Sequence, residues 1–293
     1  MSAPAPAGLV VVDKPAGMTS HDVVARIRRL AGTRKVGHAG TLDPMATGVL
    51  LIGVNRATRL LGHLMLTEKA YDAVVRLGVA TTTDDAEGEV SSETSASDVT
   101  EEQVRGAFAA LVGDIEQVPS SVSAIKVDGR RAYDRVRAGE AVELKARPVT
   151  VHAIDVHGIE RHGDVVDVSV SVRCSSGTYI RAIARDVGAA LGVGGHLTAL
   201  RRTAVGPFTL EDASTLDELA DRFEVVPINE VARRCFPTRT LDEADAASVL
   251  VGRKLGLDLG AEGPVAVFDG AGEFLALYEQ RGETAAAVAV FAS

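Results

Sequence analysis

The chain has 293 residues, of which 46% are hydrophobic, and a formal net charge of −9. This length suits one large hydrophobic core with a small second domain. No apolar run approaches the roughly 20 residues that span a bilayer, and the N-terminus lacks the basic stretch of a secretory signal. Cys174 and Cys235 show no Cys-x-x-Cys spacing, so neither a disulfide framework nor a metal site is predicted. We therefore expect a cytoplasmic protein that does not enter a membrane.

The charge is unevenly distributed along the chain. Lys and Arg outnumber Asp and Glu by nine to five in residues 1–72, seven to four in 123–147 and five to one in 173–202. Residues 81–118 and 211–293 each sum to −9. Phosphate binding depends on the local field, so the three basic segments could form one RNA-binding face despite the acidic total. Scattered solvated charge explains the same counts, and composition alone does not separate the two.

The N-terminal third begins with a predicted flexible tail, residues 1–8. GLVVVDK then predicts a strand, and Thr19 or Ser20 can cap a helix that ends at Gly32. The apolar face of this helix consists of Val23, Val24, Ile27 and Leu30. GVLLIGV and AYDAVVRLGV predict two further strands.

The middle of the chain mixes helices and strands. Thr100 and Gln103 fit a capping box that opens a helix, with Val104, Phe108 and Leu111 as its buried stripe. Residues 149–159 and 165–173 predict strands, and the alternation in VVDVSVSV predicts one buried and one wet face. A helix is expected from about 178 to 191. This order lacks the regular rhythm of a doubly wound fold and predicts an α+β fold with a mixed, mostly antiparallel sheet.

Beyond Pro237 the texture changes. Short apolar runs separated by glycines, as in GPVAVFDGAGEFLALYE, predict a compact β-rich unit. We place the boundary between Ile228 and Arg239. The expected domains are thus 9–232 and 238–293.

Residues 35–60 (KVGHAGTLDPMATGVLLIGVNRATRL) are the densest candidate for chemistry. Glycines around His38 allow tight bends, and Pro44 holds Asp43 in an extended or turn conformation. Taken alone, an Asp before Pro is usually a turn residue. The familiar P-loop, Gly-x-Ser-x-Gly and zinc-protease motifs are missing, and GVGGHL follows a predicted helix where a dinucleotide loop requires a strand.

The segment GTLDP resembles the signature of the TruB family of tRNA pseudouridine-55 synthases. Four further segments resemble that family in the same order, over roughly residues 9–210: DKPAGMTS, EKAYDAVVRLG, CSSGTYIRAIARDVG and LTALRRTAVGPF. VPSSVSAIKVDGRRAYDRVRAGE resembles the family's RNA-gripping thumb, about residues 119–147, although Ser120 stands where the family usually has a second proline. Residues 238–293 resemble the PUA-like domain that is often attached. The resemblance implies the pseudouridine synthase fold with a PUA-like C-terminal domain.

The resemblance also implies roles for individual residues. Asp43 is expected to be the nucleophile, Arg181 to pair with it, and Tyr71 to stack on the target base and assist proton removal. Neighbours of Arg181 at i+3 and i+4 are Ala184 and Arg185, so its anion is expected from elsewhere in the chain. Tyr179 and Leu200 are expected to line the base pocket, and His38 to fill the space left by the extruded base. Candidates for contacts with the RNA backbone are Lys126, Arg130, Arg131 and Arg202.

The expected reaction is therefore the isomerisation of uridine 55 in the T stem-loop of tRNA, after base flipping. No cofactor or metal is expected, and the protein is predicted to act as a monomer without an obligatory protein partner. An RNA-folding chaperone without catalysis, or a synthase for other RNAs, are the alternatives. Whether Asp43 attacks the uracil ring or the sugar is left open.

Overall fold

The computed structural model separates into two compact units. The first unit comprises residues 1–44, 48–65 and 205–293, and the second comprises 45–47 and 66–204. The structure describes residues 5–120, 126–127, 130–131 and 144–292. Within these ranges, no helix is both long and apolar enough to span a membrane.

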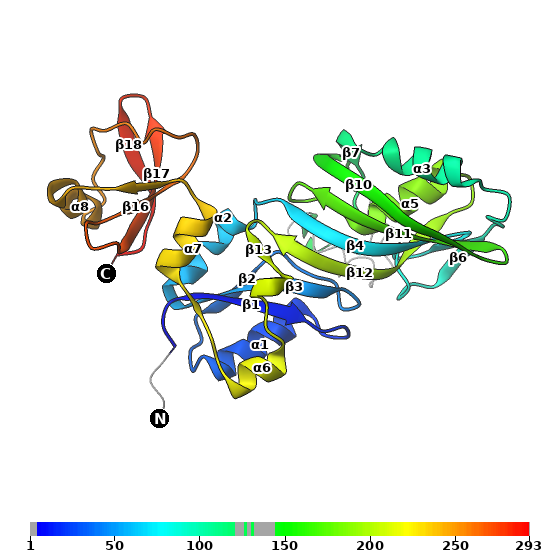
Figure 1. Cartoon of the computed structure of the whole chain (residues 1–293), viewed down its shortest axis with the longest axis horizontal. Helices are drawn as coiled ribbons and strands as arrows, with labels where there is room; N and C mark the ends of the chain where they lie inside the picture. Colours follow the sequence, from blue (N-terminus) through cyan, green and yellow to red (C-terminus); the bar gives the residue numbers. More distant parts are fainter. Residues whose placement is uncertain (1–4, 121–125, 128–129, 132–143, 293) are drawn as a thin grey trace. The chain divides into compact units, whose positions relative to one another are not determined.

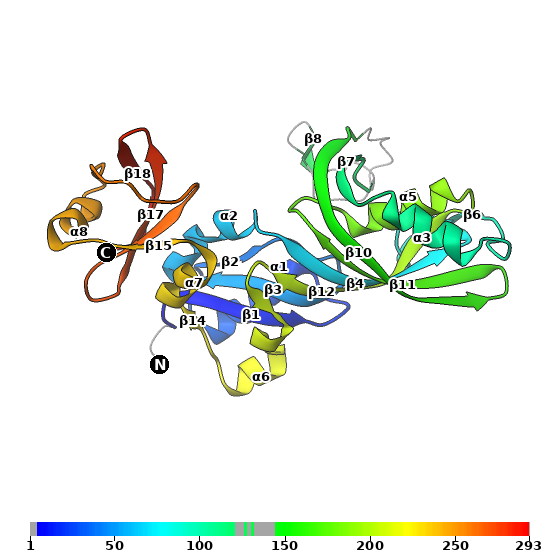
Figure 2. The same cartoon turned by 45° about the horizontal axis from the view of Figure 1, so that its top comes forward.

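The first unit is built on strands β1 (Gly8–Lys14) and β3 (Thr47–Val54), which pair antiparallel. β14 (Val226–Pro227) lies on the other side of β1, and β2 (Val36–Ala39) pairs with β3. Helices α1 (Ser20–Leu30) and α6 (Leu216–Asp221) lie side by side against β1 (Figures 1 and 2). Nearly every residue of β1 and β3 is buried, which explains their continuous apolar runs.

Helix α1 begins as its sequence predicts. Thr19 is the N-cap: its hydroxyl accepts a hydrogen bond from the Asp22 amide, and the Asp22 carboxylate accepts one from the Thr19 amide. The apolar stripe faces inward, and Val23, Val24 and Ile27 are buried. The helix therefore fixes the position of Ser20 in its first turn, where Ser20 contacts Leu42 of the loop that carries Asp43.

The C-terminal part of the first unit is β-rich, as predicted. Strands β15 (Thr238–Thr240), β16 (Val265–Phe268), β17 (Phe274–Arg281) and β18 (Thr284–Val290) form one sheet in that order, beside α8 (Glu243–Leu250). Its aromatic side chains join the core of β1 and β3: the rings of Phe274 and Phe291 stack at 4.8 Å in the same cluster as Leu9 and Leu51. The helix α7 (Ile228–Cys235) supplies Val231 to this shared core. The domain boundary at 228–239 stays a prediction.

The second unit is an antiparallel sheet covered on one face by helices. β4 (Lys69–Leu77), β11 (Val165–Cys174), β10 (Arg147–His162) and β7 (Gly113–Gln117) follow one another, with β12 (Gly195–Val205) beside β4. Helices α3 (Glu101–Ala109) and α5 (Ile180–Ala190) pack on it (Figure 2). A short pair, β5 (Val79–Thr81) and β6 (Val90–Glu93), follows β4. Positions along β11 alternate as predicted: Val166, Val168, Val170 and Val172 are buried, whereas the polar residues between them are partly exposed, so one face of the sheet is wet.

The remaining short elements are η1 (Asn55–Arg59), α2 (Leu61–Leu64), β8 (Lys126–Val127), β9 (Arg130–Arg131), β13 (Phe208–Thr209) and η2 (Leu210–Asp212). The prediction of an α+β fold with a mostly antiparallel sheet is confirmed. The capping box at Thr100 and Gln103 is also present, and Val104 and Phe108 are buried behind it. Helix α5 begins at Ile180 rather than near 178, since Tyr179 is its extended N-cap residue.

Candidate active site

Asp43 lies in a half-buried loop of the first unit. Hydrogen bonds from other residues hold the backbones of its two neighbours, Leu42 and Pro44. On its N-terminal side, the Ser20 hydroxyl accepts a hydrogen bond from the Leu42 amide at 2.9 Å and donates one to the Leu42 carbonyl at 3.1 Å. Ser20 is 1% exposed, so water does not compete for these groups. The α1 helix thereby fixes the residue that precedes Asp43.

The C-terminal side of Asp43 is held by a buried lysine. The Lys14 ammonium donates hydrogen bonds to the carbonyls of Met18 at 2.7 Å, Pro15 at 2.9 Å and Pro44 at 3.2 Å. Gly17 adds a backbone amide bond to the same Pro44 carbonyl at 2.8 Å. Lys14 is 0% exposed, and a buried ammonium is tolerable only where its donors are satisfied. The turn 14–18 and the Asp43 loop are thus tied together through one cation.

His38, the predicted space-filling residue, lies on β2 in the same unit as Asp43. Its ring meets the ring of His21 edge to face, with centroids 5.3 Å apart. Because α1 carries His21 and β2 carries His38, the pair links the helix to the strand that leads into the Asp43 loop. The structure therefore holds His38 on rigid elements next to that loop.

Arg181 lies in the first turn of α5 in the second unit, with 5% of its side chain exposed. Its Nη1 lies 3.2 Å from Oδ2 of Asp85 and donates to the Thr83 carbonyl at 3.0 Å. Asp85 is equally buried, at 4% exposure. The expectation that its anion comes from outside α5 is met by Asp85, a residue the sequence reasoning missed. Pairing of Arg181 with Asp43 stays a proposal.

The loop that carries Asp85 is itself tightly organised. Oδ1 of Asp85 accepts hydrogen bonds from the Thr83 hydroxyl at 2.5 Å and from the Glu87 amide at 3.1 Å. Its neighbour Asp84 has φ +61°, a left-handed conformation that Asp tolerates better than most residues. The Asp84 carboxylate faces Arg185, whose Nη1 lies 3.3 Å from its Oδ2. Two adjacent aspartates thus serve two different arginines of α5.

The start of α5 is fixed by Gln117 at the end of β7. The buried side-chain amide of Gln117 accepts from the Tyr179 amide at 2.8 Å and donates to the Tyr179 carbonyl at 3.1 Å. These bonds replace the missing side-chain cap of α5. They set the position of both Tyr179 and Arg181 relative to the sheet.

Tyr71 lies on β4 with 7% exposure, opposite Val172 of β11. It shares the helix-covered face of the strand with Lys69, two residues earlier. Burial, together with the charge of Arg202, lowers the pKa of the Lys69 ammonium to about 8. Burial likewise raises the pKa of the Cys174 thiol to about 11. The surroundings of Tyr71 therefore disfavour charge on titrating side chains.

Leu200 lines a hollow of about 610 Å³ in the second unit. Polar groups from the sheet border it, among them a chain in which Ser171 donates to Asp72 at 2.6 Å and contacts Nε2 of His157 at 2.7 Å. Arg202 is only 1% exposed. Its guanidinium therefore lies below the protein surface, and its contact with RNA phosphates stays a prediction.

The other predicted backbone contacts fall in the thumb. The structure describes the short strands β8 and β9, which pair through Lys126 and Arg131. The side chains of Lys126, Arg130 and Arg131, and residues 121–125, 128–129 and 132–143, lie outside the described residues. The role of the thumb stays a prediction.

Comparison with known proteins assigns this arrangement to a family. Models described as "TruB family pseudouridylate synthase (N terminal domain)", "tRNA pseudouridylate synthase B C-terminal domain" and "tRNA Pseudouridine synthase II, C terminal" match residues 28–180, 181–234 and 236–292. The chain belongs to the TruB family. This TruB-family pseudouridine synthase is 59% identical to "tRNA pseudouridine synthase B" of Arthrobacter sp. (strain FB24), over 97% of this chain and 96% of the relative. It is also 59% identical to the protein of that name from Thermobifida fusca (strain YX), over 97% and 98% of the two chains.

Solved structures agree with this assignment. A chain of a Cbf5–Nop10–Gar1 complex matches with a TM-score of 0.74 and 28% identity, over 97% of this chain and 85% of that one. A chain of an H/ACA ribonucleoprotein bound to a substrate RNA matches with a TM-score of 0.71 and 27% identity, over 98% and 85%. The chain is therefore an enzyme with the fold of pseudouridine synthases.

Proposed function

We propose that this TruB-family enzyme converts uridine 55 in the T loop of tRNAs into pseudouridine, with Asp43 as its nucleophile. The similarity to relatives named tRNA pseudouridine synthase B supports tRNA as the substrate. The observation that carries the role of Asp43 is the support on both sides of it. Ser20 fixes Leu42 and Lys14 fixes Pro44, so the carboxylate between them is presented from a loop that cannot easily shift.

The reaction breaks the bond between N1 of uracil and C1′ of ribose, turns the base, and joins C5 to C1′. The proton on C5 is then lost and N1 gains one, so the product is an isomer of the substrate. A carboxylate can assist by adding to the uracil ring or by capturing C1′. In the proposal Asp43 performs this step, Tyr71 stacks on the base and helps to remove the C5 proton, and Tyr179 and Leu200 line the base pocket.

Arg181 is proposed to keep Asp43 ionised during the reaction. A guanidinium stays charged at all relevant pH values and offers a planar fork to a carboxylate. Nη1 of Arg181 already contacts Asp85 and Thr83, and these contacts fix the orientation of the guanidinium. In the proposal, its other nitrogens act on Asp43. The target uridine must leave the stacked loop before it can react, and His38 is proposed to occupy the vacated space.

The decisive test compares Asp43→Asn with the wild-type protein. Asn keeps the shape of the side chain and removes the nucleophile, so tRNA binding should persist while tritium release from 5-³H-uridine tRNA falls to background. Asp217→Asn is a matched control, since that side chain is 97% exposed. Appreciable turnover by Asp43→Asn, after a check for deamidation, would contradict the assignment.

The same assay tests the substrate and the partner requirement. The purified chain alone should form pseudouridine in unmodified tRNA, whereas the Cbf5 chain was solved together with Nop10 and Gar1. A tRNA with cytidine at position 55 should yield none. Pseudouridine at another position of that tRNA would contradict the site, and wild-type protein that binds tRNA without releasing tritium would favour the chaperone alternative.

A further inference from the structure

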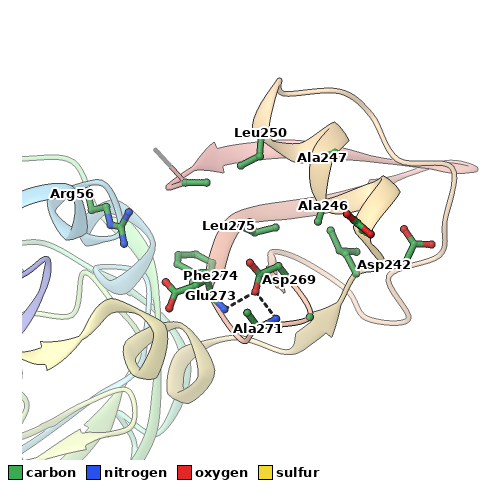
Figure 3. A pocket seen from close by; sticks show the side chains of 14 residues that line it. Arg56, Asp242, Ala246, Ala247, Leu250, Asp269, Ala271, Glu273, Phe274 and Leu275 are labelled. Carbon is green, nitrogen blue, oxygen red and sulfur yellow. Dashed lines mark hydrogen bonds between the residues drawn. The ribbon is translucent and has the colours of Figure 1, made fainter.

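The C-terminal sheet of the first unit carries a hollow of about 690 Å³ that no step of the proposed reaction uses. Figure 3 shows α8 on one side of it, and β17 with the turn before that strand on the other. Arg56 lines one edge. We call it the acidic hollow, and its principal lining residues are Asp242, Glu243, Leu250, Asp269, Glu273 and Phe274.

The floor and one wall of the acidic hollow are apolar. Leu275 of β17 forms the floor at 6% exposure, in the same apolar cluster as Val249 of α8, whereas Phe274 borders the hollow and turns its ring toward Phe291. Ala246, Ala247 and Leu250 of α8 face them across the hollow. Leu250 is 56% exposed and the adjoining Val251 is 67% exposed. Large apolar side chains gathered at the mouth of an apolar depression are typical of an interaction site.

The rim is acidic, and only some of its carboxylates make contacts that stabilise the fold. Asp242 caps α8 and Asp269 accepts the amides of Ala271 and Glu273, so these two carboxylates have structural roles. By contrast, the carboxylates of Glu243 and Glu273 make neither an ion pair nor a side-chain hydrogen bond with any residue that the structure describes. Both residues are exposed. They leave a negative field at the edge of an apolar surface.

The single cation at this rim is already engaged. The Arg56 guanidinium donates to the Phe291 carbonyl at 3.2 Å. Residues 236–293 as a whole carry nine Asp and Glu against four Lys and Arg. An RNA phosphate would therefore meet repulsion rather than counterion release here.

A metal ion does not fit this rim either. Among residues 5–120, 126–127, 130–131 and 144–292, no three His, Cys, Asp or Glu side chains come close enough to hold one. The chemistry that complements the hollow is instead a cation joined to an apolar group.

We propose that the acidic hollow docks a short segment of a protein partner in which Lys or Arg residues flank an apolar side chain. The apolar side chain enters between α8 and β17, against Leu250 and Leu275. The flanking cations pair with Glu243 and Glu273. This docking goes beyond the proposed reaction, and it gives the C-terminal sheet a role in recruitment that does not depend on the tRNA.

The test uses the full chain and a fluorescein-labelled synthetic peptide of alternating Lys and Leu, with a matched peptide of alternating Glu and Leu. Fluorescence anisotropy should show binding of the Lys peptide only, and this binding should weaken with salt because exposed charges are screened beyond about 8 Å at physiological ionic strength. The double variant Glu243→Lys/Glu273→Lys should lose about ten-fold or more in affinity, since two attractive contacts become repulsive. Glu262→Lys/Glu283→Lys changes the same charge at exposed sites outside the lining, and should lose much less.

Leu250→Ser separates docking from the other possible uses of this surface. Because the side chain is more than half exposed, the variant should fold normally, bind the Lys peptide more weakly and bind tRNA as the wild type does. The proposal is overturned if both double variants lose the same affinity, or if the Glu peptide binds equally well. It is also overturned if Leu250→Ser loses tRNA affinity while peptide binding is unchanged, or if the wild type is a dimer that this variant dissociates.

Discussion

The Asp43 loop is held by neutral backbone groups around one buried ammonium, whereas Arg181 is held by a buried ion pair. Lys14 contacts three carbonyl oxygens, and Ser20 contacts a carbonyl and an amide. Arg181 instead pairs with the buried carboxylate of Asp85 at 3.2 Å and donates to the Thr83 carbonyl at 3.0 Å. The first arrangement fixes a backbone path, and the second fixes the position of a charge.

The difference follows from what each residue is proposed to do. A nucleophilic carboxylate needs a precise location, which hydrogen bonds to its flanking backbone supply. A guanidinium that is to act on another anion must remain charged while buried, and an isolated buried charge is costly. Asp85 compensates that charge and leaves the planar fork in one orientation. Removing a partner should therefore have different consequences in the two regions.

The largest effect is expected from Asp85→Asn. Loss of one partner of a buried ion pair should lower the free energy of unfolding by about 3–5 kcal/mol. Single-turnover pseudouridine formation should fall by about a hundred-fold as Arg181 loses its orientation, because misplacement by about 1 Å can cost that much. Chemical denaturation and single-turnover assays would measure the two losses.

The neighbouring aspartate provides the control for that variant. Asp84→Asn removes a carboxylate from the same loop, but Asn tolerates its left-handed backbone equally well and Arg185 also pairs with Asp186 at 2.8 Å. Stability and rate should both stay near wild type. Equal losses in the two variants would show that the loop, rather than the pair with Arg181, is what matters.

A smaller loss of stability is expected from Lys14→Met, which keeps the length of the side chain and removes the ammonium. Three partly buried carbonyls lose a charged donor, so the unfolding free energy should fall by about 3 kcal/mol and the Asp43 loop should loosen. Turnover should fall more than tRNA affinity does. Lys35→Met, at an exposed position whose side chain makes no described contact, is the control. Unchanged turnover in Lys14→Met would show that the ammonium does not support the reaction.

The surroundings of the Asp43 loop and those of Arg181 also differ in how much of their structure could be predicted from the sequence. Local periodicity and capping residues predicted β1, α1, β11 and α3 correctly, because those signals lie within one element. Lys14 lay within the predicted strand GLVVVDK, but its burial and its three carbonyl partners were not predicted. Asp85 and Gln117 were missed, because their partners Arg181 and Tyr179 are distant in the chain and only the packing of α5 on the sheet brings them together.

Arg202 was placed among the RNA contacts by its charge and its motif. The alternation of β12 points it inward, where it is 1% exposed and close enough to Lys69 to lower the pKa of that ammonium. Charge alone did not reveal burial, since a cation on a strand can face either side. For the same reason, the sequence did not predict that backbone hydrogen bonds hold the Asp43 loop whereas an ion pair holds Arg181.

The pH dependence of stability should reveal Lys69. Its pKa is about 8 in the folded protein, against 10.5 ordinarily, so between these values the unfolded chain binds more protons and the contribution of Lys69 to stability rises with pH. The raised pKa of Cys174 makes its own contribution to stability fall with pH, so the wild type is compared with Lys69→Met, which retains Cys174. From pH 8 to 10.5 the unfolding free energy of the wild type, relative to Lys69→Met, should rise by up to about 3 kcal/mol. A difference that stays flat with pH would contradict the lowered pKa.

The smallest effect, and the sharpest test of the comparison, is expected from Ser20→Ala. The hydroxyl serves both backbone groups of Leu42, and its loss should lower the unfolding free energy by about 1–2 kcal/mol. Thr19→Ala removes the N-cap of the same helix one residue earlier and should lower it by a similar amount, about 1 kcal/mol. Of these two side chains, Ser20 is the one with a described hydrogen bond to the loop that carries Asp43. Single-turnover rates should therefore fall several-fold in Ser20→Ala and stay near wild type in Thr19→Ala, although melting curves hardly distinguish the two. If both variants lose the same rate, the Asp43 loop responds to the stability of α1 in general, and the hydroxyl of Ser20 has no separate part in positioning the nucleophile.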